Sequence, residues 1–191
     1  MSLNPKRLIL ASASPRRNSL LSGMGYTFTI HAPDVDETVS GKPEEMVKAL
    51  AVRKAKAVSE TEKGAWIIAA DTLVSYRDEA LGKPVDEDDA KRMLMMLSGN
   101  THEVFTGVCL LDSDSGKYIV SAVCTRVHFR EILPSEADEY IATGEPMDKA
   151  GAYAIQGGAA GFVKSFDGSY TNIVGFPTEE FEQMYKRFTG A

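Results

Sequence analysis

Residues 8–17 read LILASASPRR, and the character of the chain changes in the middle of this stretch. Its apolar first half suits a buried strand, whereas the serines and the proline favour a turn and a helix start. We therefore predict a strand at 8–12 and a helix at 14–24. Arg16 and Arg17 would then lie at the positive end of the helix dipole, which is unfavourable unless an anion binds there.

Outward from this stretch, strands and helices alternate along the first half of the chain, and paired strands follow. Prolines and acidic residues in the first turns, and glycine after a last turn, mark the helices. We predict strands at 26–32 and 65–76, a hairpin of 102–112 with 117–130, a second hairpin over 161–175 with Asp167-Gly168 as its turn, and helices at 43–60, 86–99, 134–144 and 177–188. This order predicts an α/β protein with a mixed sheet.

Length and composition restrict the class of protein. The 191 residues suit one domain or two small lobes with a shared core. A net charge of −6 argues against a duplex nucleic-acid partner, which requires a basic face. No apolar run approaches the roughly 20 residues of a membrane span, and the start lacks a signal-peptide core. We therefore expect no membrane partner and a cytoplasmic location.

The cysteines and histidines give no sign of a metal or nucleophile site. Cys109 and Cys124 lie in strand-like runs, and we expect both to be buried, small hydrophobic residues without a disulfide. No spacing of cysteine and histidine suggests zinc. His31, His102 and His128 are far apart in the sequence, and we expect mostly structural roles for them.

Asp71 is the strongest site candidate from the residues alone. It follows the apolar run 66–70, and a carboxylate at the end of a buried strand is costly unless it is paired, hydrogen-bonded or bound to a metal. The alternative is a structural cap. The polar turn 12–17 is a second candidate, because hydroxyls, main-chain amides and arginine forks bind phosphate. Its alternative is an N-cap at Ser14 followed by solvated arginines.

Two further segments have the composition of ligand-binding loops. The acidic stretch Asp34 to Thr38 reads DVDET and either holds a divalent cation or forms an acidic surface loop. The segment 148–161 is rich in glycine, which lets the main chain approach a ligand closely. The alternative for this segment is a flexible connection.

Three motifs in order carry a family resemblance: LASASPRR, ADTLV followed by GKP, and GEPMDKAGAYAIQG. With DVDET and RKAKAV between them, they resemble the Maf family of nucleoside triphosphate pyrophosphatases from about Leu8 to Pro177. The resemblance implies one domain over 1–191, with an α/β fold related to the inosine-triphosphate pyrophosphatases. That fold is an elongated mixed sheet flanked by helices, with two lobes around a central cleft. Family members are typically homodimers that cleave a nucleoside triphosphate between its α- and β-phosphates with a divalent metal such as Mg, Mn or Co.

The resemblance also implies a role for each site residue. Asp71 would be the catalytic acid or base, and Glu37 and Asp71 would hold the metal. The phosphates would be surrounded by Ser12, Arg17, Lys54 and Lys83, and the base would be read by Arg16, Thr72 and Gln156. Asp34 and Asp36 receive no role from the resemblance.

The motifs distinguish between groups of the family. SPRR rather than SPWR, together with ADT and YAIQG, resembles the group that prefers dTTP and UTP over 7-methyl-GTP. The implied function is nucleotide-pool house-cleaning: hydrolysis of dTTP, UTP and modified pyrimidine nucleotides to the monophosphate and pyrophosphate. Two alternatives stay open, a non-catalytic nucleotide-binding regulator of cell division and a pyrophosphatase for another modified nucleotide. The presence of both Glu37 and Asp71 favours an enzyme.

Overall fold

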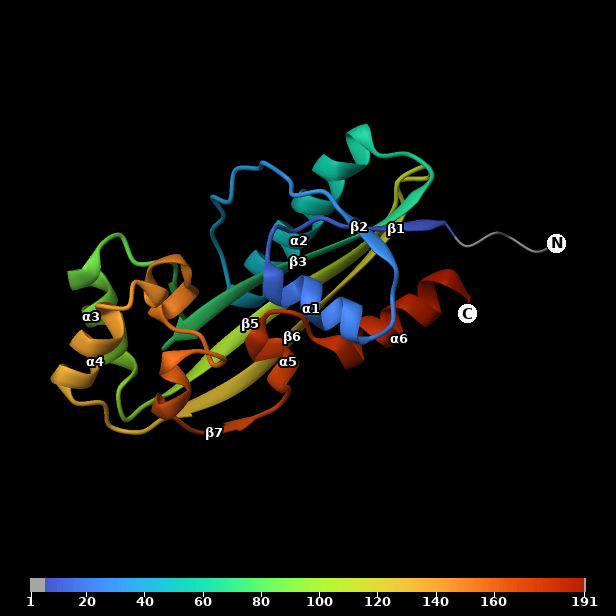
Figure 1. Ribbon diagram of the computed structural model, residues 1–191. Coiled ribbons are helices and arrows are strands. Elements are labelled where there is room, and N and C mark those ends of the chain that lie inside the picture. Colours follow the sequence, from blue (N-terminus) through green and yellow to red (C-terminus); the bar gives the residue numbers. More distant parts are fainter. Residues whose placement is uncertain (1–5, 191) are drawn as a thin grey trace. The chain divides into compact units, whose positions relative to one another are not determined.

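The computed structural model describes residues 6–190, which divide into two compact units (Figure 1). The described part of the first unit comprises residues 6–71, 106–123 and 175–190, and the second comprises residues 72–105 and 124–174. Three long strands have residues in both units: β3 (Ala65–Tyr76), β5 (Thr101–Asp112) and β6 (Tyr118–Phe129). The expectation of two lobes around a cleft stays a prediction.

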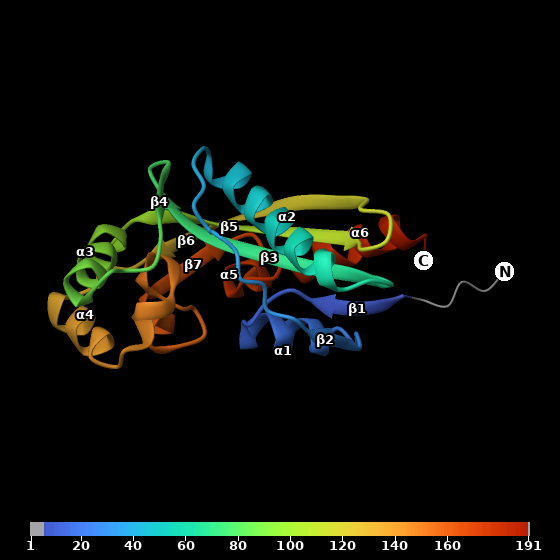
Figure 2. The same cartoon turned by 90° about the horizontal axis from the view of Figure 1, so that it is seen from above.

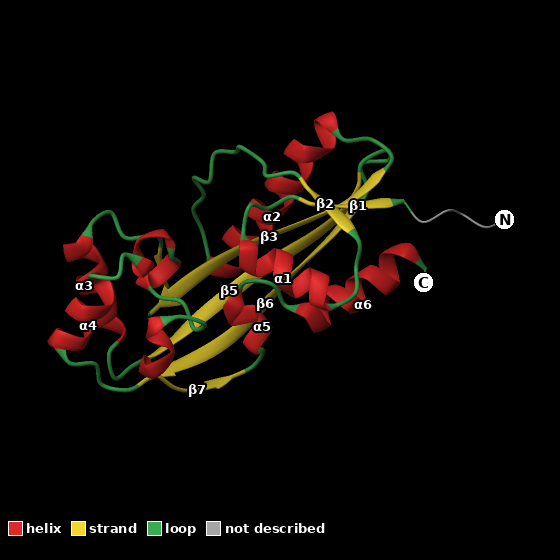
Figure 3. Cartoon of the chain, viewed as in Figure 1, coloured by secondary structure: helices red, strands yellow, loops and turns green. Residues whose placement is uncertain are grey.

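The strands form one mixed sheet of seven strands in the order β2-β1-β3-β5-β6-β7, with β4 paired to β3 (Figure 3). β1 (Arg7–Leu10) lies between β2 (Phe28–Ile30) and β3 and runs parallel to both. β4 (Glu79–Leu81) and β7 (Val163–Asp167) add antiparallel pairs to β3 and β6. The prediction of a mixed sheet is confirmed.

β4 is a strand that the sequence analysis did not predict. Arg77 and Asp78 join it to β3 with φ values of 52° and 65°. These left-handed conformations at both central residues are those of a tight hairpin turn. Such turns usually carry asparagine or glycine, so this one has a weak sequence signal.

Two apolar layers pack on the sheet in the first unit, and Figure 2 shows the helices that lie beside it. Successive residues of β1 alternate between them, as the pleat of a strand requires. Leu8 packs in the layer that contains residues of α1 (Pro15–Gly23) and α6 (Thr178–Thr189), whereas Ile9 packs in the layer that contains α2 (Pro43–Thr61). Helices therefore flank the sheet, which confirms the predicted fold class.

The helix α2 lies close against β5 because Gly107 has no side chain. A Cβ atom at this position would lie 2.3 Å from the main-chain carbonyl oxygen of Val47. The buried residues Ala51 and Ala55 keep the same face of α2 small. This close approach holds in place the helix that carries two cations of the site described below.

In the second unit, α3 packs on α4 and on a short 3-10 turn. The bounds of these elements are Glu87–Leu97 for α3, Pro134–Ile141 for α4, and Glu145–Asp148, Ala150–Ala152 and Gly158–Phe162 for the turns η1, η2 and η3. The segment 148–161 thus contains turns of 3-10 helix between its glycines. Among the helices within residues 6–190, none is both long enough and apolar enough to cross a membrane.

The predicted hairpin over 161–175 is wrong. Only its first strand forms, as β7, and the chain continues after Gly168 into the helix α5 (Tyr170–Val174). Asn172 is buried in this helix, and its Nδ2 donates hydrogen bonds of 2.9 Å to the Val104 carbonyl and to Thr125 Oγ1. These tertiary contacts override the preference of the β-branched residues for a strand.

The two cysteines differ in exposure. Cys109 is buried as predicted, and burial raises the pKa of its thiol to about 12. The prediction that Cys124 is buried is wrong, because this residue of β6 is exposed. β7 pairs with β6 only over Arg126–Phe129, so Cys124 precedes the paired part of the strand.

Candidate functional site

A serine-rich turn connects β1 to α1 in the first unit. Ser12 is buried, and its Oγ accepts a hydrogen bond from the main-chain nitrogen of Ser14 at 3.2 Å. Ser14 caps α1, since its Oγ accepts from the main-chain nitrogen of Arg17 at 3.4 Å, and Pro15 begins the helix. The turn therefore gathers hydroxyls and main-chain amides at the helix end that favours anions.

Arg17 folds back onto this turn instead of extending into solvent. Its Nε donates to the carbonyl oxygen of Gly175 at 2.9 Å, and its Nη1 donates to Ser12 Oγ at 3.3 Å. Burial lowers the pKa of the Arg17 guanidinium below its ordinary value, and the nearby carboxylate of Asp71 opposes this shift. The alternative of a solvated arginine is therefore excluded for Arg17.

Arg16 is half-buried on the same first turn of α1. Its Nε is buried and makes no hydrogen bond to any atom of residues 6–190. A buried N–H group without an acceptor costs about 1–3 kcal/mol. This position is therefore suited to a ligand that brings an acceptor.

Asp71 lies in β3 and pairs with Lys54 of α2. Both residues are buried, and Lys54 Nζ donates to Asp71 Oδ1 at 2.6 Å. The apolar residues before Asp71 hold the strand in the core, while α2 brings the lysine from the face above it. The buried carboxylate thus has the partner that its burial requires.

Glu37 approaches the same ammonium group from the loop between β2 and α2. Its Oε1 lies 2.6 Å from Lys54 Nζ, although its side chain is 56% exposed. Arg53 holds this loop, because its Nη1 donates to the carbonyl oxygens of Asp36 and Thr38. The sequence analysis missed Arg53, whose only signal was its place beside Lys54 in the motif RKAKAV.

Two carboxylates share the ammonium group of Lys54. One ammonium nitrogen lies 2.6 Å from an oxygen of Asp71 and 2.6 Å from an oxygen of Glu37. Within the described residues, no group of three or more histidines, cysteines and acids gathers in a metal-binding arrangement. Two carboxylates nevertheless fit Mg²⁺, which commonly takes one or two protein carboxylates and completes its shell with water and substrate phosphates.

Three of the expected site residues belong to the second unit. Thr72 follows Asp71 directly in β3, Lys83 is exposed after β4, and Gln156 is exposed between η2 and η3. The segments of Lys83 and Gln156 are tied together, because the main-chain nitrogen of Gly151 donates to the carbonyl of Gly82 at 3.0 Å. That these residues join the group around Lys54 stays a prediction.

The chain is similar to one protein family and to several known proteins. A family model described as "Maf-like protein" matches residues 7–188. The protein named "dTTP/UTP pyrophosphatase" of Pelotomaculum thermopropionicum is 48% identical over 96% of this chain and 97% of its own length. The proteins of the same name from Geobacter sulfurreducens and Geotalea uraniireducens are 48% and 50% identical, over 95% and 94% of this chain and 96% and 94% of their own lengths.

Proposed function

The chain belongs to the Maf family, and we propose that it hydrolyses dTTP and UTP to the monophosphate and pyrophosphate, with modified pyrimidine nucleotides as further substrates. The observation that carries this proposal is the ammonium of Lys54 held between Asp71 and Glu37. The name that the curated relatives share supports the choice of substrates. Such an activity would serve as house-cleaning of the nucleotide pool.

The turn between β1 and α1 would bind the phosphates. Ser12 and the first amides of α1 offer hydrogen-bond donors, and Arg17 offers a planar fork that matches phosphate oxygens. Lys54 adds a buried positive charge beside Asp71, whose carboxylate acts on Arg17 of this turn, and Lys83 of the second unit would complete the set. The negative charge of a bound triphosphate would offset the two arginines, which are otherwise unfavourable at the N-terminal end of a helix.

Asp71 is proposed as the general base that accepts a proton from the attacking water. Its carboxylate is oriented by Lys54 at 2.6 Å, and a positioned carboxylate contributes typically 10²–10⁴-fold in rate. Asp71 and Glu37 are also the residues that would hold a divalent cation such as Mg, Mn or Co. A bound cation of this kind offsets the negative charge of the triphosphate and lowers the pKa of a coordinated water.

Arg16, Gln156 and Thr72 are proposed to read the base. Uracil and thymine present an N3–H donor between two carbonyl acceptors, and the Gln156 amide can pair with this edge through one acceptor and one donor. The same amide matches cytosine after a flip, so discrimination needs a group that only donates. Arg16 is such a group, and its buried Nε has no acceptor within the described chain.

The remaining assignments concern context. We propose a homodimer in the cytoplasm, on the resemblance to the family and on the location of free nucleotides. The names of the relatives do not favour a regulator without activity or an enzyme for 7-methyl-GTP. A regulator would also have no use for the paired carboxylates Asp71 and Glu37.

A panel of nucleoside triphosphates tests the proposed function. The protein is incubated with dTTP, UTP, CTP, GTP and 7-methyl-GTP, with Mg²⁺ or Mn²⁺ and with a chelator, and pyrophosphate and orthophosphate are measured separately. We expect pyrophosphate as the first product from dTTP and UTP, and no release in the chelator. Orthophosphate as the first product, or a rate that the chelator leaves unchanged, would contradict the proposal.

A matched variant controls for the general loss of a carboxylate. Asp114→Asn removes an exposed acid that pairs with Lys6 at the turn between β5 and β6. This variant should keep the product, the metal dependence and the order of substrates. Binding of dTTP without any product in the unmodified protein would instead support the regulator.

A further inference from the structure

The first half of β6 is an open edge of the sheet in the first unit. Among the described strands, β7 pairs with β6 over Arg126–Phe129 only, so residues 118–123 have a neighbouring strand on the β5 side alone. None of these residues is buried, and Tyr118 is 42% exposed. Ile119 and Val120 pack on the two apolar layers, and both remain partly exposed.

The composition of this edge is unusual for a monomer. Residues 118–123 read YIVSAV and include no charged residue, proline or glycine. Edge strands of monomers are usually protected by charges, proline, bulges or short length, because their main-chain groups pair readily with another strand. An unprotected apolar edge therefore favours the addition of a strand.

The main-chain groups available to such a strand follow from the alternation along β6. The main-chain nitrogen of Asp112 donates to the carbonyl oxygen of Lys117 at 2.9 Å, so Lys117 directs its main-chain groups toward β5. Successive residues of an antiparallel strand alternate in this direction. Tyr118, Val120 and Ala122 consequently direct their N–H and C=O groups to the open side.

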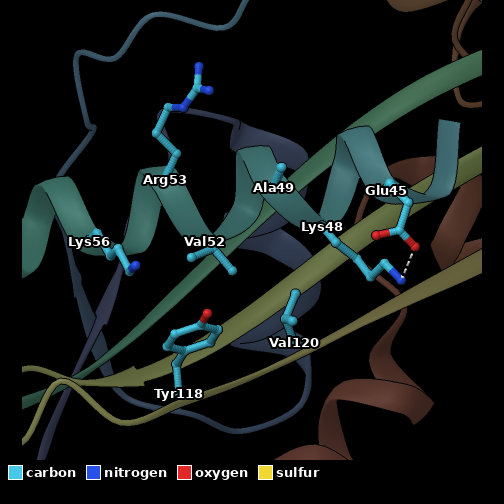
Figure 4. Close-up of a pocket in the computed structure, with 8 residues that line it drawn as sticks. All are labelled: Glu45, Lys48, Ala49, Val52, Arg53, Lys56, Tyr118 and Val120. Atoms are coloured by element: carbon cyan, nitrogen blue, oxygen red, sulfur yellow. Dashed lines mark ion pairs between the residues drawn. The ribbon is translucent and has the colours of Figure 1, made fainter. Parts of the chain in front are cut away.

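A groove of about 590 Å³ runs beside this edge, between α2 and β6 (Figure 4). Its apolar part is formed by Ala49 and Val52 of α2 with Val120 of β6, and Val52 points toward the strand. Tyr118 lies at one end, with Lys56 Nζ 5.4 Å from the centre of its ring. The groove extends the apolar surface of the edge onto the helix.

The charged residues at the two ends of the groove differ in sign. At the N-terminal end of α2, Glu45 of the groove and Glu44 just outside it outnumber Lys48, with which both form ion pairs. At the other end lies Lys56, whereas Arg53 directs its guanidinium away from β6 (Figure 4). A twofold rotation brings the acidic end of the groove in one copy across from the basic end of the groove in the other, so the surface complements itself.

The helix also indicates where the twofold axis crosses the strand. Lys56 lies over Tyr118. The middle of the groove, between Ala49 and Val52, is about 8 Å from Lys56 along the axis of α2. That distance corresponds to between two and three residues of β6, roughly the position of Ser121.

We propose that the open edge of β6 and the adjoining groove bind a second copy of this chain. β6 pairs antiparallel with β6 of the partner subunit across a twofold axis at Ser121. In this register Val120 of each copy exchanges main-chain hydrogen bonds with Ala122 of the other, and the two grooves face each other over one continuous sheet. This inference gives the proposed homodimer its surface, and its test does not depend on hydrolysis.

Disulfide formation tests the register. In a Cys124→Ser background, Ser121→Cys places two thiols in a non-hydrogen-bonded pair with Cα atoms about 4.5 Å apart, within the range of a disulfide. Ala122→Cys is the matched control, because the two copies of residue 122 lie about 8 Å apart in this register. We expect a covalent dimer from Ser121→Cys alone. A covalent dimer from Ala122→Cys alone would refute the register.

Sedimentation equilibrium tests the interface itself. The unmodified chain should have twice the mass of 20.7 kDa, and Ser121→Lys, which places two ammonium groups at the axis, should raise the dissociation constant at least about tenfold. Ser115→Lys, in the exposed turn before β6, should have no effect. A monomer at about 0.1 mM, or a dimer that Ser121→Lys leaves intact, would overturn the proposal.

A separate readout keeps this proposal apart from the proposed function. Circular dichroism and thermal unfolding establish that Ser121→Lys is folded. Hydrolysis of dTTP is then measured on the same samples. Absence of hydrolysis in an unmodified chain that is dimeric would contradict the enzyme and leave the interface standing. An unmodified chain that is monomeric and active would contradict the interface alone.

Discussion

Replacement of Lys54 by methionine tests the charge pair at the centre of the site. Methionine keeps an apolar, unbranched side chain and removes the ammonium that lies 2.6 Å from Asp71 Oδ1. The two side chains are only 11% and 12% exposed, so the remaining carboxylate is left without compensation. Loss of one partner of a buried pair costs about 3–5 kcal/mol, and the exposed pair with Glu37 adds at most about 1 kcal/mol. We expect the free energy of unfolding to fall by about 3–5 kcal/mol in Lys54→Met.

Urea unfolding in a chelator measures this loss, and Mg²⁺ should recover part of it, because Asp71 and Glu37 would then hold a cation. Lys186→Met is the control, since it removes an exposed ion pair on α6 and should cost no more than about 0.5 kcal/mol. Lys54→Met combined with Asp71→Asn should be more stable than Lys54→Met alone, since neither position of the buried pair then carries a charge. A loss below about 1 kcal/mol, or a double variant less stable than both single variants, would refute the reasoning.

Three further predictions concern rate, selectivity and pH. Asp71→Asn should keep the fold, measured by circular dichroism, and lose at least about a hundredfold in kcat, whereas near-normal turnover would assign the base elsewhere. Arg16→Trp and Gln156→Glu should reduce the preference of kcat/KM for UTP over CTP by about five- to 150-fold, and an unchanged ratio would remove both residues from base recognition. His102 is buried with its pKa lowered from 6.5 to about 3, so the unfolded chain binds the proton first and stability falls as the pH drops below 6.5. His102→Gln should reduce the slope of the free energy of unfolding against pH by up to about 1.4 kcal/mol per pH unit in urea titrations. An unchanged slope would contradict the assignment of this pH dependence to His102.

The long regular elements could be predicted because their patterns are local. The apolar run that ends at Asp71 predicts a strand at 65–76, and β3 has these bounds. A proline and an acidic first turn mark the start of α2, which ends one residue beyond the prediction. In both elements the preference of the sequence and the tertiary contacts agree, so local reasoning suffices.

The elements that could not be predicted depend on distant contacts. The residues of α5 prefer a strand, and the helix depends on the hydrogen bonds of Asn172 to Val104 and Thr125. The exposure of Cys124 depends on where β7 begins to pair with β6. Neither contact leaves a pattern in the neighbouring sequence.

The same distinction between local patterns and distant contacts applies to the candidate site. Its members could be named from motifs, but their partners could not. The resemblance assigns Lys54 to the phosphates, whereas the structure pairs it with Asp71, which is 17 residues away along the chain. The anchor of Arg17 on Gly175 spans 158 residues, so no local pattern could show it.

That anchor has a consequence for the order in which the protein is completed on the ribosome. The first unit includes residues 175–190, whereas all of the second unit precedes Gly175 in the chain. Since domains fold as units, the first unit cannot be completed before the residues from Gly175 onward are available, whereas the second unit requires none of them. Arg17 is synthesised 158 residues before the carbonyl group that it contacts. A chain that stops before Gly175 would therefore lack the carbonyl that anchors Arg17, and the turn proposed to bind phosphate would form without this support.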